Sequence, residues 1–252
     1  MAITAADVKK LREATGAGPM ECKNVLTETG GDFEKAIKIL KEKGLAAAEK
    51  RADRATNNGR ISIKISGNKA CLVELATETD FVARNPEFIE LGDKIAEKAL
   101  EKGYTEITDE LSEMVKALAT KIRENMSLKR VQIVDAGANG HLESYIHGEG
   151  IIGTVVNVSA DKPEVFAKDE AKAFVFSLAM HVAAANPEAL SQDGVSPAVL
   201  DEQKDIFSKQ MQADEKLQGK PANVLEGILK GKLNKYLADI CLLDQKYIKN
   251  DN

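Results

Sequence analysis

The sequence contains one hairpin pattern twice, and this repeat constrains the fold more than any other feature. The first copy, GRISIKISGNKACLVELAT, begins at Gly59, and the second, GHLESYIHGEGIIGTVVNVSA, begins at Gly140. In each copy apolar and polar residues alternate on both sides of a glycine turn, which is typical of two antiparallel strands. Gly148 aligns with Gly67, and the second turn is two residues longer. We therefore expect an α+β fold with two related halves and antiparallel sheets; chance likeness between two hairpins is the alternative.

Helical periodicity follows each hairpin. Apolar residues at helical spacing predict helices at 86–102, 109–125 and 168–185. The run LKRVQIVDA, which starts at Leu128, predicts a return to strand. We assign residues 56–139 to core subdomain N and residues 140–195 to core subdomain C.

Residues 1–55 have the pattern of a small module of three helices. Thr4 and Asp7 have the spacing of a capping box. Pro19 suits the first turn of a second helix, and Asp32 can cap a third. Apolar residues follow at helical spacing after each start, so we expect three short helices around one core.

Two more helices and a tail are predicted after the second half. Residues 196–240 contain two helical patterns joined near Gly219-Lys220-Pro221, which indicates an antiparallel helical hairpin. Its outward face could dock a partner, or the hairpin could only stabilise the chain. Residues 241–252 form a C-terminal tail that either returns to the core or is truncated.

The charge balance argues against nucleic acid as a direct ligand. Lys and Arg number 35 against 40 Asp and Glu, a net charge of −5, whereas a phosphate-binding surface usually needs a basic excess. The N-terminus lacks the apolar segment of a signal peptide, and no run is long enough to span a bilayer. We expect a cytoplasmic protein with no membrane partner.

Cysteines and histidines do not form a metal-binding pattern. Cys22, Cys71 and Cys241 are isolated, which favours reduced, buried thiols over disulfides or a zinc site. His141 and His147 lie six positions apart on one predicted strand, about 20 Å from end to end, so one metal ion cannot bind both. We expect no metal.

The motifs of common enzyme classes are absent or misplaced. Residues 148–153 fit G-x-G-x-x-G, but the β-branched run TVVNV that follows predicts a strand, whereas a dinucleotide site needs a helix there. The sequence contains no P-loop motif and no G-x-S-x-G motif. We expect no cofactor and no catalytic residues, so the protein should not be an enzyme.

The segment ETDFVARN at residues 78–85 places two apolar residues in a polar connection. In one interpretation, Asp80 caps the following helix while Phe81 or Val82 packs its first turn onto the core, where one apolar side chain contributes roughly 1.5–3 kcal/mol. In the other, Asp80 is a cap or anion and Phe81 projects as an anchor for a partner.

Two segments resemble the bacterial translation elongation factor Ts family, the guanine nucleotide exchange factors for elongation factor Tu. They are LREATGAGPMECKNVL at residues 11–26 and ELATETDFVARN at residues 74–85. SYIHG from Ser144 and AMHVAA from Ala179 are weaker matches in the expected order. The resemblance covers residues 2–245 and implies a ubiquitin-associated (UBA)-like three-helix module, a two-subdomain core and a helical hairpin.

The resemblance also implies a partner-binding site. In the family, an aromatic residue of the T-D-F-V loop inserts between two helices of the nucleotide-binding domain of elongation factor Tu, disturbs the magnesium and phosphate site, and releases GDP. Phe81 would be this wedge and Asp80 its hydrogen-bonding neighbour. The implied contacts to GDP-bound and nucleotide-free elongation factor Tu are Arg12, Met20, Lys23, Thr79, Asp80, Phe81, Val82, Met126, His147 and His181.

The sequence departs from the family pattern at three places. Pro19 stands where the family usually has an aliphatic residue, and Ala76 replaces a common polar residue; we expect both to be tolerated. The chain stops at Asn252, whereas common bacterial members continue with a further strand and helix. Partner contacts from that segment, and whether the chain is complete, therefore stay open.

Two further alternatives remain at this stage. Because UBA-like modules serve as docking domains, the chain could be a non-catalytic adaptor that only tethers a partner. The helical hairpin could pair with itself in a homodimer, with the partner, or with neither.

Overall fold

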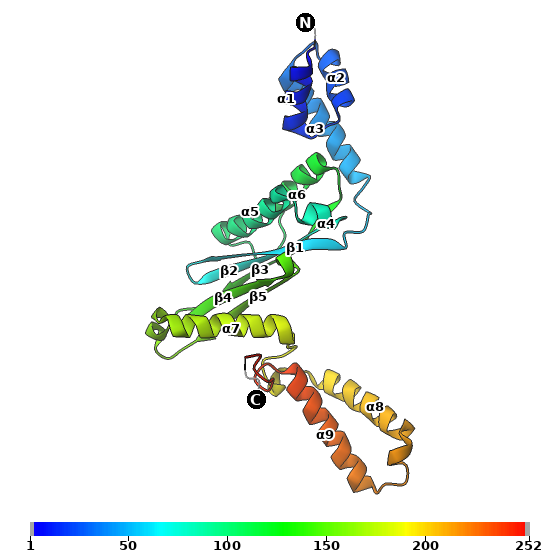
Figure 1. The fold of residues 1–252 in the computed structure, drawn as a ribbon, viewed down its shortest axis with the longest axis vertical. Helices are drawn as coiled ribbons and strands as arrows, with labels where there is room; N and C mark the ends of the chain where they lie inside the picture. Colours follow the sequence, from blue (N-terminus) through cyan, green and yellow to red (C-terminus); the bar gives the residue numbers. More distant parts are fainter. Residues whose placement is uncertain (1–2, 250–252) are drawn as a thin grey trace. The chain divides into compact units, whose positions relative to one another are not determined.

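The first three helices form a module with its own apolar core. The computed structural model describes residues 3–249 and shows α1 (Ala5–Thr15), α2 (Pro19–Glu28) and α3 (Phe33–Glu49) (Figure 1). The predicted capping box is confirmed, since the Thr4 hydroxyl accepts the Asp7 N–H and the Asp7 carboxylate accepts the Thr4 N–H. Asp32 caps α3 as expected. The core of this module comprises Leu11, Ala17, Cys22, Val25, Leu26, Ala36 and Leu40.

A three-stranded antiparallel sheet follows. Its strands are β1 (Asn58–Ser66), β2 (Lys69–Thr77) and β3 (Met126–Asp135), in the order β1-β2-β3. Helices α5 (Pro86–Lys102) and α6 (Asp109–Ile122) cover one face (Figure 1). The predicted α6 is three residues too long, because Arg123 adopts a left-handed φ of 69° and ends the helix. The largest apolar cluster lies between this sheet and the two helices and includes Val73, Val82, Phe88, Ile95 and Leu111.

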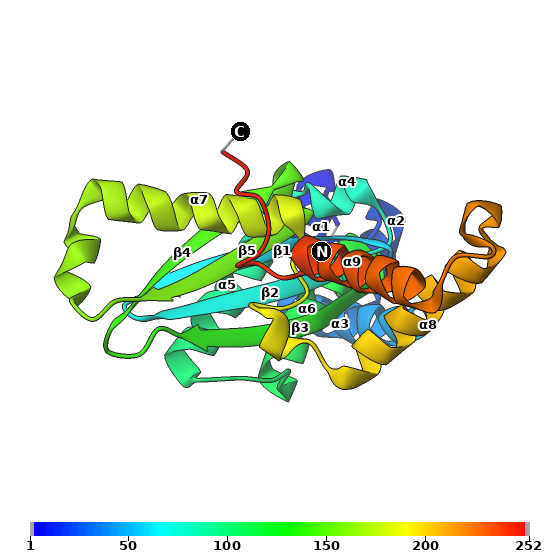
Figure 2. The same ribbon diagram turned by 90° about the horizontal axis from the view of Figure 1, so that it is seen from below.

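The second hairpin pairs β4 (Gly140–His147) with β5 (Ile152–Ser159). A short turn, η1 (Gly148–Gly150), joins them, so the G-x-G-x-x-G segment runs between two strands, as expected. A small cluster of Ala70, Ala136 and Leu142 packs this hairpin against the first sheet, and Figure 2 shows the five strands from below. The predicted α+β class with antiparallel sheets is confirmed.

The glycines that begin the two repeats have the same physical role. A side chain on Gly59 would collide with the Leu75 carbonyl oxygen, and one on Gly140 with the Ala136 carbonyl oxygen. Each hairpin therefore starts where another stretch of backbone passes too close for a Cβ atom.

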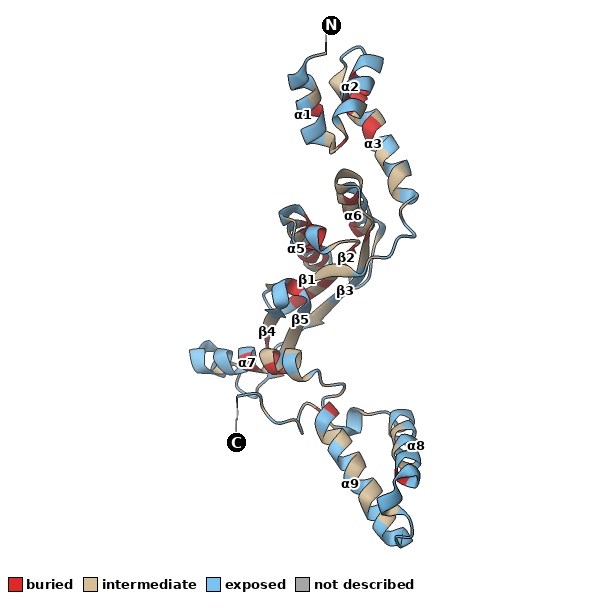
Figure 3. Ribbon diagram, turned by 45° about the vertical axis from the view of Figure 1, so that its right-hand side comes forward, coloured by how far each residue is buried: buried red, intermediate tan, exposed pale blue. Residues whose placement is uncertain are grey.

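Residues from Ser177 onward form a second compact unit. It comprises the end of α7 (Asp169–Ala185), then α8 (Pro197–Ala213) and α9 (Ala222–Ile240), which pack as a hairpin with much exposed surface (Figure 3). The Phe207 and Tyr236 rings join the two helices edge to face, 6.4 Å apart. The unit starts within α7, whereas the sequence pattern placed a limit at residues 195/196, so the predicted domain limits stay predictions.

The chain after α9 packs within the same unit. The Leu242 N–H donates to the Ala189 carbonyl, and Gln245 donates to the Ala185 and Asp239 carbonyls. The last three residues of the predicted tail lie outside the described part of the chain. Among the described helices, none has both the length and the apolar character needed to cross a bilayer.

Candidate functional site

One turn of helix turns the Phe81 side chain toward solvent. This helix, α4 (Asp80–Ala83), lies between β2 and α5. Phe81 is 82% exposed, whereas Val82 is 8% exposed and belongs to the cluster between the sheet and its helices. The two apolar residues of ETDFVARN therefore have different roles: Val82 packs on the core, and Phe81 is free to contact another molecule.

Thr79, and not Asp80, caps this helix. The Thr79 hydroxyl accepts the Val82 N–H at 3.4 Å, and the Asn85 side chain caps α5 through the Glu87 N–H at 2.8 Å. The interpretation in which Asp80 caps the helix expected at 86–102 is wrong, because Asn85 caps that helix and Asp80 is the first residue of α4, a short helix that the sequence pattern does not predict.

Glu124 ties the start of α4 to the end of α6. Its carboxylate accepts the Thr79 N–H at 3.1 Å, the Thr79 hydroxyl at 2.9 Å and the hydroxyl of the buried Thr77 at 3.1 Å. Hydrogen bonds to an ionised acceptor are the stronger kind, so this carboxylate restrains the backbone that presents Phe81.

A second carboxylate, Glu78, holds the same connection from the other side. It accepts the Asn125 N–H at 2.6 Å and lies 3.4 Å from the Arg54 guanidinium. The Asn125 N–H is the main cause that lowers the pKa of Glu78, and Arg54 lowers it further. The Asn125 side chain donates in turn to the Ala52 and Arg54 carbonyls.

Sequence reasoning missed Glu78, Glu124 and Asn125. These contacts join residues more than 40 positions apart, and no local pattern marks either carboxylate. The sequence pattern placed Glu124 and Asn125 inside the helix expected at 109–125, so it gave no signal for the turn after α6 that brings them to these partners.

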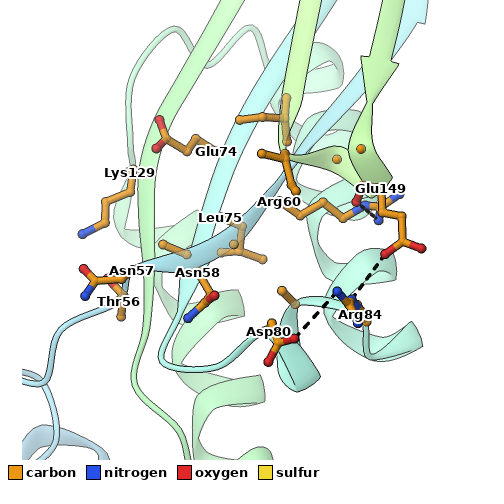
Figure 4. A pocket seen from close by; sticks show the side chains of 17 residues that line it. Thr56, Asn57, Asn58, Arg60, Glu74, Leu75, Asp80, Arg84, Lys129 and Glu149 are labelled. Carbon is orange, nitrogen blue, oxygen red and sulfur yellow. Dashed lines mark hydrogen bonds and ion pairs between the residues drawn. The ribbon is translucent and has the colours of Figure 1, made fainter.

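The η1 turn of the second hairpin lies beside α4. Arg84 Nε is 3.3 Å from the Glu149 carboxylate and Arg84 Nη2 is 3.7 Å from that of Asp80. A cavity of about 370 Å³ opens between α4, β1 and η1, and Figure 4 shows Arg84 between the two carboxylates. His147 immediately precedes this turn and is exposed, with Nδ1 2.9 Å from the Tyr145 hydroxyl.

The N-terminal module brings its three predicted contact residues together. Arg12, Met20 and Lys23 line one groove of about 450 Å³ with Ile3 and Val8. The Met20 side chain is apolar, yet 66% of this residue is exposed to solvent. The groove thus combines apolar side chains with three cationic groups, which belong to Lys9, Arg12 and Lys23.

The other two predicted contact residues are buried. Met126 is 8% exposed, pairs with Thr77 across β2 and β3, and packs in the same cluster as Val82. His181 lies in the second unit at 3% exposure, with Nε2 3.1 Å from the Gln245 side-chain oxygen and Nδ1 accepting the Ile248 N–H. Neither side chain is available at the surface of this structure, and a role in partner binding stays a prediction for both.

No group of His, Cys, Asp and Glu residues in the described range 3–249 is arranged to hold a metal ion. What the site offers is an exposed aromatic ring, a rigid base and a nearby anion. Such a surface can bind another macromolecule and act on it mechanically, because an aromatic anchor presented in a fixed conformation loses little entropy on binding.

Comparison with known proteins places the chain among relatives of one kind. The family model described as "Elongation factor TS" matches residues 78–252. Elongation factor Ts of Treponema denticola is 46% identical over 251 residues, which cover 100% of this chain and 88% of that protein. Elongation factor Ts of Treponema pallidum (strain Nichols) is 45% identical over 262 residues, covering 100% and 89% respectively, and that of Clostridium acetobutylicum is 38% identical over 263 residues, covering 99% and 83%.

Proposed function

This chain belongs to the elongation factor Ts family, and from that premise we propose that it binds elongation factor Tu in its GDP-bound form and promotes release of the nucleotide. In this proposal Phe81 and Asp80 enter the nucleotide-binding domain of elongation factor Tu and disturb its magnesium and phosphate site. The observation that carries it is the exposure of Phe81 on a helix that is capped by Thr79, held at its start by Glu124 and anchored to the core through Val82.

The anchoring of α4 supports a wedge more than a passive contact. Val82 packs on the core, Thr79 caps the helix, and the Glu124 carboxylate, which follows α6, accepts a hydrogen bond from the Thr79 hydroxyl. Little conformational entropy is then lost when the ring enters a partner, so the roughly 1.5–3 kcal/mol from burying a phenylalanine remains for displacing the partner's helices.

Asp80 provides the charge beside the wedge. Its carboxylate is about half exposed and lies at the solvent side of α4. An anion in that position suits the unpaired N–H groups at the start of a partner helix. The Arg12, Met20 and Lys23 groove would form a separate contact that grips the partner while the wedge acts.

Release requires no covalent step. The protein and GDP are two ligands of elongation factor Tu that weaken each other's binding by the same factor. Stabilising the nucleotide-free state accelerates GDP release, and incoming GTP then displaces the exchange factor.

The test is stopped-flow release of fluorescent GDP from elongation factor Tu, with and without this chain. The wild-type chain should accelerate release. Phe81→Ala should still bind elongation factor Tu but lose most of the acceleration. Phe174→Ala, which removes another exposed ring, is the matched control and should behave as wild type.

Unchanged release with Phe81→Ala would contradict the wedge. If the wild-type chain binds elongation factor Tu without accelerating release, the adaptor alternative, with binding through the UBA-like module, is the better description.

A further inference from the structure

The turn of the second hairpin places a carboxylate against the helix that carries Phe81. We propose that Glu149 is a positioning residue for nucleotide release, which shares the Arg84 guanidinium with Asp80 and so weakens the hold of Arg84 on the carboxylate that the partner needs. This inference rests on the proposed function, since it concerns how the Asp80-Phe81 wedge is prepared.

One guanidinium is shared between two carboxylates. Arg84 is the C-cap of α4 and forms an ion pair with Asp80 four residues earlier, an ordinary spacing for a helical ion pair. In the structure its nearer partner is Glu149, at 3.3 Å against 3.7 Å for Asp80, and Figure 4 shows it between them. Without Glu149, Arg84 would close on Asp80 and compete with the partner for that carboxylate.

The backbone of the turn is built to hold Glu149 in this place. Glu149 has a left-handed conformation, φ 59° and ψ 27°, which is unusual for a residue with a side chain. Gly148 and Gly150 on either side also have positive φ. A glutamate kept in such a conformation, where asparagine or glycine would be less strained, is best explained by what its carboxylate does.

Strand β1 contacts the backbone of η1 through Arg60. The Arg60 guanidinium donates to the Glu149 carbonyl oxygen, and a side chain on Gly150 would collide with the Arg60 side chain. Arg60 thus engages the backbone of the turn, and the Glu149 carboxylate is directed to Arg84.

The ion pairs lie at the surface, which sets the size of the effect. The side chains of Asp80, Arg84 and Glu149 are each more than half exposed. Such pairs are weak and are screened by salt, so removing Glu149 should slow release by about two- to five-fold at low ionic strength and by less at high ionic strength.

Glu149→Gln is the direct test, because it keeps the shape of the side chain and removes its charge. The maximal rate of GDP release from elongation factor Tu should fall by about two- to five-fold in dilute buffer, and the difference should largely vanish near 1 M salt. Glu149→Gly, which suits the left-handed backbone, should give the same loss and covers the case in which the glutamine variant folds poorly. Glu164→Gln, which removes an exposed carboxylate from η2 (Pro163–Ala167), controls for net charge.

Combined variants separate positioning from a general structural effect. In an Arg84→Gln background, Glu149→Gln should have no further effect on release, because the guanidinium that it restrains is gone. Additive losses in the double variant would overturn the inference. The inference would also be overturned if Glu149→Gln and Glu149→Gly released GDP at the wild-type rate in dilute buffer. If Phe81→Ala had lost acceleration in the same experiment, the proposed function would still stand. Failure of the proposed function differs, since the wild-type chain itself would then not accelerate release.

Discussion

Phe81 and Val82 are consecutive residues of α4, yet the first side chain is 82% exposed and the second is 8% exposed. Successive residues of a helix point about 100° apart, so one turn can bury one side chain and present the next. Binding and stability therefore depend on different residues of the same turn, and mutations can separate them.

Phe81→Ala should leave the free energy of unfolding nearly unchanged and remove most of the acceleration of GDP release. Val82→Ala should lower the free energy of unfolding by about 1–3 kcal/mol, because it opens a cavity in the cluster that includes Phe88 and Leu91. Urea denaturation measures the first quantity and stopped-flow release the second. A large drop in stability for Phe81→Ala would contradict the assignment of its ring to the exterior.

Thr79→Ala should destabilise the protein by about 0.5–2 kcal/mol, because it removes the cap of α4 and a hydroxyl that donates a hydrogen bond to Glu124. Release should also slow, because the helix that presents Phe81 is less restrained. Thr79→Ser keeps the hydroxyl and should preserve both properties. If the serine variant is as impaired as the alanine variant, the methyl group and not the hydroxyl matters, and the role assigned to the cap is wrong.

The Glu78 carboxylate predicts how stability changes in acid. Its pKa is lowered in the folded state from an ordinary value of 4.5, chiefly by the Asn125 N–H, so its contribution is present above pH 4.5 and is lost as pH falls through the lower folded-state pKa. Glu78→Gln should therefore flatten the fall in stability below pH 4.5. Arg54→Gln, which removes the weaker cause, should give an intermediate slope. Equal slopes for wild type and Glu78→Gln in urea titrations at several pH values would refute this.

Replacing a helical glycine by alanine usually stabilises a protein, but at Gly92 we expect it to destabilise this one. Glycine in a helix is usually less favourable than alanine by up to about 1 kcal/mol, but a Cβ at this buried position of α5 would collide with the side chain of Ser62 on β1. Gly92→Ala should lower the melting temperature. Gly231→Ala on α9, where a Cβ meets no atom within 4 Å, should raise it. Thermal unfolding of the two variants side by side tests the contact, and a stabilised Gly92→Ala would show that α5 lies farther from the sheet.

Local patterns predicted most of the elements because their causes are local. Alternation about Gly67 and Gly148 indicated both hairpins, and the Thr4 and Asp32 caps marked helix starts. The family resemblance rested on two short motifs and is confirmed by the family model and the relatives. The sequence pattern does not predict α4, because four residues are too few to show helical periodicity, and it gives to Asp80 the capping role for the next helix that Asn85 has in the structure.

The sequence by itself determined most of the helices and strands, the two hairpin patterns and the family, all of which depend on residues that are close in the chain. Tertiary structure alone decided which of Phe81 and Val82 faces solvent, because burial of one depends on a sheet and a helix contributed by other segments. It also decided the contacts of Glu124 with Thr79 and of Glu149 with Arg84, which join residues 45 and 65 positions apart. Contacts at such separations follow from how strands and helices pack, and no local spacing encodes them.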